Sequence, residues 1–320
     1  MTTRIIGTGS ALPEEVITND DMAKIVDTSD EWISSRTGIR QRKLVGRDEN
    51  VVTLGTEAAR KALEDSGTAP EEIDLVLTAT SSSEVYFPNV ACQIQGNLHL
   101  TNAVAMDVSA ACSGFLFVLH IAHAYIQSGV YRKILLVGAE TLSRLIDWED
   151  RTTCVLFGDG AGACVVEAQE TGIIDAVLHS DGGMGHVLTG SAAALVTPKS
   201  EALAAHPLHM DGQAVFKFAV KKVPECIQEL LERNQVEADD VKWYLLHQAN
   251  KRIIQSVAKR MHQPEEKFPV NLEYYGNTSA ASIPILLDEM YHSGQIKRGD
   301  RCILSGFGAG LTWGAALLDW

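Results

Sequence analysis

The sequence predicts an α/β protein made of two similar halves. Strand-like and helix-like segments alternate along most of the 320 residues, which is typical of helices packed on sheets. Strand-like segments such as residues 135–137 are continuously apolar, as expected when helices cover both faces of a sheet. In addition, Cys112 and Asn277 each begin a helix-like segment that closes at a glycine 17 residues further on. If the halves are structural repeats, these two residues are equivalent positions at the mouths of two helices.

The first half, residues 1–171, is predicted to alternate strands with helices. Its N-terminal residues have the pattern of a short strand, a glycine turn and an Asn/Asp helix cap. The expected strands are Arg4–Gly9, Asp74–Ala79, Val104–Val108 and Ile134–Val137, and the expected helices are Asn19–Val26, Thr53–Asp65, Asn89–Leu98 and Phe115–Gln127.

The second half, residues 172–320, is predicted to repeat this alternation. The expected helices are Ala214–Arg233, Lys251–Met261 and Ser279–Ser293, and the expected strands are Val241–Leu246, Phe268–Asn271 and Cys302–Leu304. Residues 179–213 are rich in Gly, Ala, His and Pro and have no clear period. We interpret them as a loop that lines a substrate passage or a subunit contact, although chance composition explains them equally well.

Composition and charge exclude several classes of protein. An apolar fraction of 46% predicts a soluble globular protein with large cores. The N-terminus lacks the pattern of a secretory leader, and no segment reaches about 18 uninterrupted apolar residues, so we expect a cytoplasmic protein. A formal net charge of −14 argues against nucleic acid or an anionic membrane as the partner of the whole surface.

Two stretches of the chain nevertheless carry only basic charges. They are residues 212–224 and residues 241–264. They indicate a local docking face for an anionic partner, whereas solvated helix faces that are balanced by acids elsewhere in the fold explain them equally well.

The cysteines and histidines do not indicate a metal site. The six cysteines show no CxxC spacing, so neither a zinc ribbon nor a thioredoxin-like site is indicated. The histidine pairs 120/123 and 206/209 lack a nearby third ligand of the usual type. We expect no metal.

Cys112 lies between the apolar strand-like residues 104–108 and the helix-like residues 115–127. At a helix N-terminus, unpaired N–H groups and the helix dipole favour a thiolate and lower the pKa of the thiol. A free cysteine is also commonly a small buried hydrophobe. Position alone leaves both interpretations open.

Three other places carry candidate chemistry. His247 follows an apolar strand-like segment and precedes a helix, where a side chain can project from a sheet edge or serve the structure alone. Asn277 equally fits an ordinary helix cap. The run Gly306–Gly310 could present backbone N–H groups to an oxyanion, but it and the run Gly158–Gly162 lack the spacing of nucleotide-binding loops.

Taken together and in this order, the motifs resemble those of β-ketoacyl-acyl carrier protein synthase III, a family of condensing enzymes with the thiolase fold. The resemblance runs essentially end to end and rests on Thr28–Ile33, Arg36–Arg40, Ala91–Gln95, Cys112, Phe157–Gly162, His247–Asn250, Gly276–Ala280 and the glycine-rich C-terminus. It implies two pseudo-repeated halves in a five-layer α-β-α-β-α arrangement. Cys112, His247 and Asn277 are similar to the Cys-His-Asn set of this family, whereas the elongating condensing enzymes have Cys-His-His.

The resemblance implies a reaction in two steps, the initiating condensation of type II fatty acid synthesis. Cys112 accepts an acyl group from acyl-CoA, and the carbanion formed when malonyl-acyl carrier protein loses CO2 then attacks it, giving 3-oxoacyl-acyl carrier protein. His247 and Asn277 hold the enolate oxygen, and the backbone N–H groups of Cys112 and Ala309 hold the tetrahedral oxyanion. Ala309 departs from a common glycine, which a backbone donor tolerates unless the position requires positive φ. We expect activity to fall as His247 is protonated or Cys112 becomes a neutral thiol.

The resemblance also implies binding residues for two substrates. For CoA they are Trp32 and Arg151 around the adenine, Arg36 and Thr37 nearby, and Gly212, Phe216 and Asn250 along the pantetheine channel. For the acidic acyl carrier protein they are Arg252, with Lys217, Lys221, Lys259 and Arg260 as additions. Phe87, reached across the interface of a homodimer, closes the acyl pocket and favours acetyl-CoA. No cofactor is implied, because both thioesters are substrates.

Two other functions stay open. A paralogue on the same fold could make a secondary metabolite or transfer an acyl group without decarboxylation, although His247 and Asn277 favour decarboxylative condensation. A silent scaffold subunit is expected to lack the nucleophile, so Cys112 argues against it. The sequence does not determine which acyl group is used.

Overall fold

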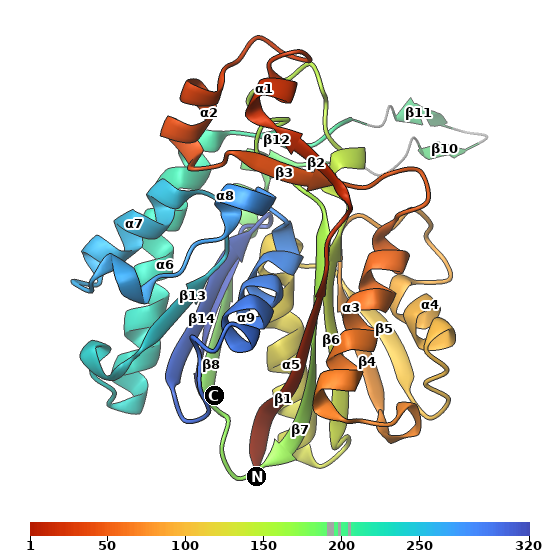
Figure 1. Ribbon diagram of the computed structural model, residues 1–320, viewed down its shortest axis with the longest axis vertical. Helices are drawn as coiled ribbons and strands as arrows, with labels where there is room; N and C mark the ends of the chain where they lie inside the picture. Colours follow the sequence, from red (N-terminus) through yellow and green to blue (C-terminus); the bar gives the residue numbers. More distant parts are fainter. Residues whose placement is uncertain (191–194, 198–199, 204–205) are drawn as a thin grey trace.

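Two β-sheets separated and flanked by helices form the frame of the protein, whose computed structural model describes residues 1–190, 195–197, 200–203 and 206–320 (Figure 1). Part of the predicted loop 179–213, namely residues 191–194, 198–199 and 204–205, lies outside the described residues. No helix among the described residues is both long and apolar enough to cross a membrane.

The strands and helices predicted for the first half are present, although the helix that begins at Asn19 ends at Met22 instead of Val26. The strands Glu15–Thr18, Gln41–Leu44 and Gly160–Gln169 and the helix Asp30–Thr37 were not predicted from the sequence. The elements up to the end of the first sheet are β1 (Thr2–Ala11), β2 (Glu15–Thr18), α1 (Asn19–Met22), α2 (Asp30–Thr37), β3 (Gln41–Leu44), α3 (Val51–Ser66), β4 (Leu75–Ala79), α4 (Val90–Asn97), β5 (Val104–Val108), α5 (Gly114–Ser128), β6 (Lys133–Glu140) and β7 (Gly160–Gln169).

The remaining elements build the second sheet and its cover. They are β8 (Ile173–Ser180), β9 (Leu188–Thr189), β10 (Leu195–Thr197), β11 (Ser200–Leu203), β12 (His209–Met210), α6 (Gly212–Asn234), β13 (Trp243–Leu246), α7 (Lys251–Arg260), α8 (Leu272–Tyr275), α9 (Ser282–His292), β14 (Arg301–Gly308) and β15 (Thr312–Asp319).

The two large sheets share one pattern of strand directions. The first has the order β1-β7-β6-β4-β5, in which β4 runs parallel to β5 and β6, while β7 runs antiparallel to β6 and β1. The second has the order β13-β14-β15-β8, in which β13 runs parallel to β14, while β15 runs antiparallel to β14 and β8. The strands β4, β6, β7 and β1 therefore correspond to β13, β14, β15 and β8, as the internal echo in the sequence predicts.

Helices fill the spaces between and outside the sheets, so the five predicted layers are present (Figure 1). Helices α3 and α4 cover the outer face of the first sheet, α5 and α9 lie between the sheets, and α6 and α7 cover the outer face of the second. Three buried apolar clusters occupy the four interfaces between layers and hold them together.

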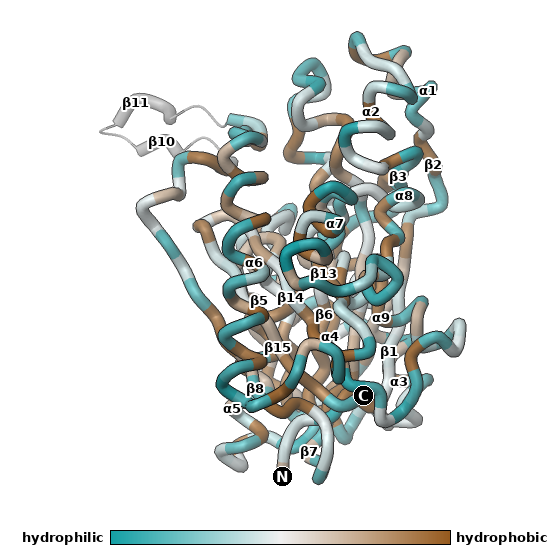
Figure 2. Tube along the Cα trace, turned by 90° about the vertical axis from the view of Figure 1, so that its left-hand side faces the viewer, coloured by the Kyte–Doolittle hydropathy of each residue, from teal (hydrophilic) through white to brown (hydrophobic). Residues whose placement is uncertain are grey.

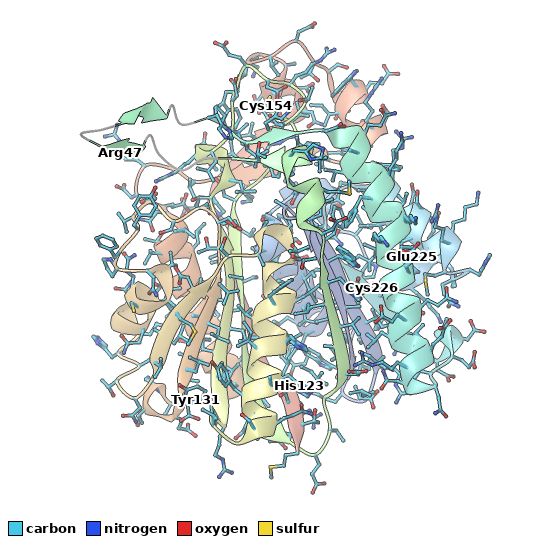
Figure 3. The ribbon with its side chains drawn as sticks, turned by 180° about the vertical axis from the view of Figure 1, so that it is seen from behind. Arg47, His123, Tyr131, Cys154, Glu225 and Cys226 are labelled. Carbon is cyan, nitrogen blue, oxygen red and sulfur yellow. The ribbon has the colours of Figure 1, made fainter. Side chains whose placement is uncertain are left out.

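Helix α6 shows how the outer layer is oriented. Its neighbouring residues Glu225 and Cys226 are exposed and buried respectively, and Figure 3 shows them on α6 with its outward side turned to solvent. In Figure 2 polar and apolar residues alternate along this helix, as a period of 3.6 residues requires when one face packs on a sheet.

The predicted strand over Phe268–Asn271 is wrong. Pro269 has no N–H to give to a strand ladder, and the side chain of Gln248 takes the place of the neighbouring strand. Gln248 donates from Nε2 to the Pro269 carbonyl (3.3 Å) and accepts the Asn271 N–H at Oε1 (3.0 Å). The segment is therefore bonded through a side chain and forms no ladder.

The two halves are similar, but the residues that correspond are not the predicted pair, Cys112 and Asn277. Ala111 (φ 46°) and Ser279 (φ 51°) each begin a 3₁₀ turn that leads directly into α5 and α9 respectively. On this backbone match Cys112 corresponds to Ala280, three residues beyond Asn277. Counting back from the closing glycines misplaces the equivalence because α5 has 15 residues and α9 has 11.

The division into halves 1–171 and 172–320 stays a prediction. All strands of the first large sheet precede residue 171, and all strands of the second follow residue 172. However, α5 and α9 come from different halves and pack together in the middle layer, so the halves share one interior.

Candidate active site

Cys112 stands where β5 ends and α5 begins. The chain turns sharply there, with Ala111 in the left-handed region and Cys112 in the following 3₁₀ turn. The side chain of Cys112 is half-buried, and its Sγ accepts a hydrogen bond from Ser279 Oγ at 3.3 Å. The turn therefore presents the thiol at the mouth of a helix, as predicted.

The expected lowering of the Cys112 pKa is not found. Burial raises the pKa of this thiol to about 12, and the nearby carboxylate of Glu140 acts in the same direction, while the hydrogen bond from Ser279 opposes it. The largest cause is the removal of water from around the sulfur. The resting form at neutral pH is therefore the thiol.

His247 follows β13 and is 3% exposed. Its Nδ1 lies 2.7 Å from Ser282 Oγ, which also accepts the Gln248 N–H at 3.3 Å. The Ser282 proton is thus available for Nδ1, and the neutral ring then carries its hydrogen at Nε2. Burial lowers the pKa of His247 to about 3, so the imidazole is neutral throughout the physiological range.

Asn277 lies in a loop that is tied to the residues before β7. Its N–H donates to the Leu156 carbonyl (2.8 Å), and its carbonyl accepts the Gly158 N–H (3.1 Å). The side-chain Oδ1 accepts the Ser279 N–H at 2.9 Å, which leaves the NH2 group as a donor for a bound molecule. The run Phe157–Gly162 thus helps to position Asn277, in agreement with the interpretation that it packs a turn.

Gly308 brings the end of β14 against the Cys112 turn. A Cβ at Gly308 would lie 2.7 Å from the Cys112 nitrogen, so only glycine permits this approach. The next residue, Ala309, does not have positive φ, whereas Gly310 does (φ 140°). Alanine therefore fits at 309, and its N–H can serve as predicted beside the N–H of Cys112.

Two cavities meet at Cys112. The first has a volume of about 350 Å³ and holds the predicted catalytic set together with most of the predicted CoA contacts. The polar residues and glycines that line it are Cys112, His247, Asn277, Arg36, Thr152, Gly212, Asn250, Arg252 and Gly308, beside the ring of Phe216. The second cavity, of about 560 Å³, is more apolar, and Leu142, Leu145, Phe157, Leu188, Leu208, Ala309 and Gly310 line it.

The predicted adenine contacts lie outside the first cavity. The guanidinium groups of Arg36 and Arg151 stack on the ring of Trp32 at 4.6 Å and 5.0 Å from its centroid. Arg151 also donates to the Asp27 carbonyl at 2.9 Å. Thr37 is buried, and its hydroxyl donates to the Ile33 carbonyl inside α2, so the structure does not bring this side chain to the cavity.

The remaining predicted residues are exposed. Phe87 is 85% exposed and lies next to the exposed Val85 and Tyr86. Of the five predicted docking residues, Arg252 lines the first cavity. Lys217 and Lys221 lie on α6, and Lys259 and Arg260 lie at the far end of α7.

Two further residues near Cys112, namely Ser279 and Glu140, were not identified from the sequence. Ser279 donates to Cys112, and its Oγ also lies 3.1 Å from the buried Glu140. A lone carboxylate that ends a continuous apolar strand, as in Lys133–Glu140, is the signal that could have found Glu140.

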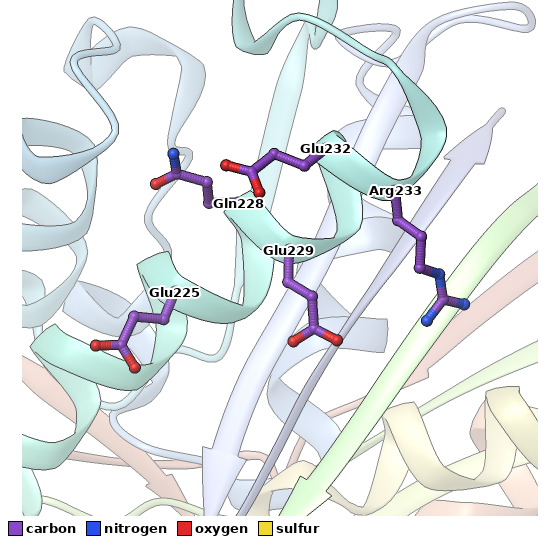
Figure 4. A pocket seen from close by; sticks show the side chains of 5 residues that line it. All are labelled: Glu225, Gln228, Glu229, Glu232 and Arg233. Carbon is purple, nitrogen blue, oxygen red and sulfur yellow. The ribbon is translucent and has the colours of Figure 1, made fainter.

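A further hollow lies on the outer side of α6, remote from Cys112 (Figure 4). Charged and amide side chains that point to solvent form it, namely Glu225, Gln228, Glu229, Glu232 and Arg233. Within the part of the chain that the structure describes, no group of three or more potential metal ligands is gathered.

The fold and the site define a class before any comparison with known proteins. A thiolase-like five-layer frame carries a cysteine at a helix mouth, with a neutral histidine and an asparagine amide on the same cavity. This is the arrangement of a condensing enzyme that works through an acyl-thioester.

The comparisons assign the family. The profile described as 3-oxoacyl-[acyl-carrier-protein (ACP)] synthase III matches residues 106–182, and the profile of its C-terminal part matches residues 231–320. The β-ketoacyl-[acyl-carrier-protein] synthase III of Clostridium acetobutylicum is 48% identical over 99% of this chain and 98% of its own length. The enzyme of a Synechococcus species is 49% identical over 99% and 95%. The chain belongs to the β-ketoacyl-[acyl-carrier-protein] synthase III family, which confirms the resemblance seen in the sequence.

Solved structures agree with this assignment. The 3-oxoacyl-[acyl-carrier-protein] synthase III of Aquifex aeolicus superimposes with a TM-score of 0.94 at 44% identity and covers 99% of this chain and 100% of its own. The priming β-ketosynthase of the R1128 polyketide pathway superimposes with a TM-score of 0.93 at 36% identity, covering 99% and 96%.

Proposed function

We propose that this protein is an initiating condensing enzyme that transfers an acyl group from acyl-CoA to Cys112 and condenses it with malonyl-acyl carrier protein. The observation that carries the proposal is the first cavity, where Cys112, His247 and Asn277 share one wall with Arg36, Asn250 and Arg252. The products are 3-oxoacyl-acyl carrier protein, CO2 and CoA. Membership of the family supports the same reaction.

In the acyl-transfer step, the sulfur of Cys112 attacks the thioester carbonyl. The developing oxyanion accepts hydrogen bonds from the N–H groups of Cys112 and Ala309, and Gly308 permits the close approach of its strand to the Cys112 turn. Loss of one such donor typically costs about 2.7 to 4 kcal/mol of transition-state stabilisation. The acyl chain occupies the apolar second cavity, since that cavity begins at Cys112.

In the condensation step, His247 and Asn277 hold the thioester oxygen of the malonyl group as CO2 leaves. Both present uncharged donors, Nε2–H and NH2, and neither donor has to lose a proton. A neutral imidazole is the form that the burial of His247 favours. The enolate carbon then attacks the acyl group on Cys112.

We further propose that the enzyme acts in the cytoplasm as a homodimer without metal or prosthetic group. The exposed Phe87, with Val85 and Tyr86, supports a partner subunit that covers this patch. Phe87 then closes the acyl cavity of the partner and favours acetyl-CoA. For CoA, Trp32 and Arg151 bind the adenine once Arg151 moves off the indole, with Arg36 nearby, and Gly212, Phe216 and Asn250 guide the pantetheine arm.

The decisive experiment is intact-protein mass spectrometry after incubation with a panel of acyl-CoAs. Wild type should gain the mass of one acyl group, largest in yield for acetyl, and Cys112→Ala should gain none. An increment that survives in Cys112→Ala would overturn the assignment of the nucleophile. A strong preference for a longer or branched acyl group would favour the role of a polyketide priming synthase, to which the chain is also similar.

A further inference from the structure

A buried carboxylate is connected to Cys112 through a single hydroxyl. Ser279 Oγ lies 3.3 Å from the sulfur of Cys112 and 3.1 Å from Oε1 of Glu140. Glu140 ends β6 and is 0% exposed. A buried carboxylate is costly unless its charge is stabilised, and the groups that bond to this one are all neutral. Stability alone therefore does not account for a buried carboxylate near Cys112.

The two oxygens of Glu140 have different surroundings. Oε2 accepts from the Ser81 N–H (3.1 Å) and from the hydroxyls of Ser82 and Thr80. Oε1 has Ser279 as its hydrogen-bond partner. Residues 80–82, which follow β4, fix Oε2 in place through these hydrogen bonds. Oε1 is therefore held toward Ser279 and Cys112.

Ser279 can serve only one of its two neighbours as a donor, because a hydroxyl carries one proton. When Glu140 is charged, Ser279 donates to the carboxylate and accepts from the Cys112 thiol. When Glu140 is protonated, the acid donates to Ser279, and Ser279 donates to a Cys112 thiolate. Both arrangements use the same positions of the heavy atoms.

We propose that Glu140 takes up, through Ser279, the proton that Cys112 releases on acylation, and returns it when condensation frees the sulfur. This inference rests on the proposed function and adds a proton-holding group to it. Glu140 acts through Ser279 and is therefore a positioning residue, whereas Ser279 touches the reacting sulfur.

The proton balance closes over the two steps. On acylation, the S–H bond of Cys112 breaks and a bond from its sulfur to the acyl carbon forms, while the bond from that carbon to the CoA sulfur breaks. The proton moves to Ser279 as the Ser279 proton moves to Glu140, and the CoA thiolate takes a proton from solvent. On condensation, the bond between the malonyl carbon and its carboxylate breaks, CO2 leaves, and the electrons of that bond form the new carbon–carbon bond to the acyl carbon. The bond from the acyl carbon to Cys112 breaks with its electrons on sulfur. Glu140 then returns the proton through Ser279.

The charges around Glu140 are compatible with this exchange. The strand neighbour β7 places Gly160 opposite it, and the contacts after β4 and in the Ser279 turn are neutral. The titratable group that faces it in the described structure is Cys112, whose thiolate the charge on Glu140 disfavours. Burial raises the pKa of Glu140 to about 7, so it can both accept and return a proton near neutral pH.

The test measures how fast Cys112 is modified at different pH values. Acetylation by acetyl-CoA is followed by rapid quench and intact mass, and alkylation by iodoacetamide is followed separately. In wild type both rates should rise up to about pH 7 and then level off as Glu140 becomes charged. In Glu140→Gln and in Ser279→Ala, both rates should fall at least about tenfold near pH 7.5 and should keep rising with pH.

Two variants sharpen the result. The double variant Glu140→Gln/Ser279→Ala should be no slower than the slower single variant, because the two residues form one path. Ser82→Ala removes a donor that stabilises the charged carboxylate, so it should move the levelling-off to higher pH without abolishing it. If circular dichroism shows that Glu140→Gln is unfolded, Ser279→Ala carries the test alone.

The outcomes separate the two proposals. If Glu140→Gln or a folded Ser279→Ala reacts with both reagents as fast as wild type near pH 7.5, Glu140 is only a repelling charge and the inference is wrong. If wild type is not acetylated but its alkylation levels off near pH 7 and loses this feature in Glu140→Gln, the proton path stands and the proposed function fails.

Discussion

At the scale of single residues, burial shapes the chemistry of the site. Cys112, Glu140 and His247 are all shifted toward their neutral forms, the first two by a raised pKa and the third by a lowered one. The common cause is loss of water around each group. Burial thus favours the uncharged form of all three side chains.

The shift of His247 predicts a pH dependence of stability. Its pKa is about 3 in the folded protein and 6.5 in the unfolded chain, so only the unfolded chain gains this proton between those values. The unfolding free energy should fall as pH decreases below about 6.5, by at most about 1.4 kcal/mol per pH unit from this residue. Urea titrations between about pH 7 and 5 should show a smaller fall in His247→Gln than in wild type. Equal falls in both would contradict the burial argument.

The lowered pKa of His247 also changes the expected pH profile of activity. Protonation of His247 lies far below the range in which the enzyme would be assayed, so it contributes no fall near neutral pH. The group that titrates there is Glu140, which the sequence did not single out.

Gly308 predicts a steric effect at the nucleophile. In Gly308→Ala the new Cβ would lie 2.7 Å from the Cys112 nitrogen, and the turn would have to move. We expect a loss of about 1 to 3 kcal/mol in unfolding free energy and at least about a hundredfold loss in acetylation rate. The matched control is Gly96→Ala in α4, where no atom lies within 4 Å, and it should leave the rate unchanged. Acetylation of Gly308→Ala at the wild-type rate would show that the close approach is not needed.

At the scale of elements, the site is assembled from strand ends. Cys112 follows β5, Glu140 ends β6, and His247 and Ala309 follow β13 and β14. Within each sheet these strands run in parallel, so their carboxyl ends meet at one edge. Helices α5 and α9 lie between the two sheets, and both begin next to these edges. The carboxyl-end edges of the two sheets therefore face a common region.

The Gln248 contact predicts a measurable cost at this scale. Gln248→Leu keeps the volume of the side chain but leaves the buried Asn271 N–H without its acceptor. We expect a loss of about 1 to 3 kcal/mol in unfolding free energy. Chemical denaturation measures it, and hydrogen exchange should show a faster rate at the Asn271 amide. An unchanged free energy would mean that the extended segment is held by packing alone.

At the scale of the whole molecule, a chain of net charge −14 has to bind an acidic carrier protein if the proposed function holds. Arg252 lies at the cavity where such a partner would deliver its thioester. Lys259 lies seven residues further along α7, which places it about 10 Å away at 1.5 Å per residue. Near physiological salt this is close to one screening length, so the two charges should contribute differently.

This difference can be measured with a pair of charge reversals. Arg252→Glu should raise the KM for malonyl-acyl carrier protein roughly tenfold at low salt, and Lys259→Glu should raise it less than about twofold. Both effects should shrink as salt is added. If Lys259→Glu has the larger effect, the carrier protein docks toward the far end of α7. The rate of acetylation by acetyl-CoA reports whether the site itself is intact.

The sequence by itself determined the α/β class, the two similar halves, the family and the residues of the cavity wall. These follow from local patterns: apolar strands, helix caps, and motifs in which Cys112, His247 and Asn277 each occupy a short recognisable run. Its failures arose where a local pattern does not contain the deciding contact. The missing strand at Phe268–Asn271 and the shifted echo depend on a side chain and a helix length that the local pattern does not contain.

Only the tertiary structure decided the protonation states and the connection from Cys112 to Glu140. A pKa shift depends on how much water the rest of the fold removes, and that water is displaced by residues far away in the chain. Ser279 and Glu140 are 139 residues apart in sequence and meet only because α9 begins beside the end of β6. A helix N-terminus in isolation favours a thiolate, whereas in this fold the thiol of Cys112 lies 3.3 Å from a hydroxyl that is itself 3.1 Å from a buried carboxylate.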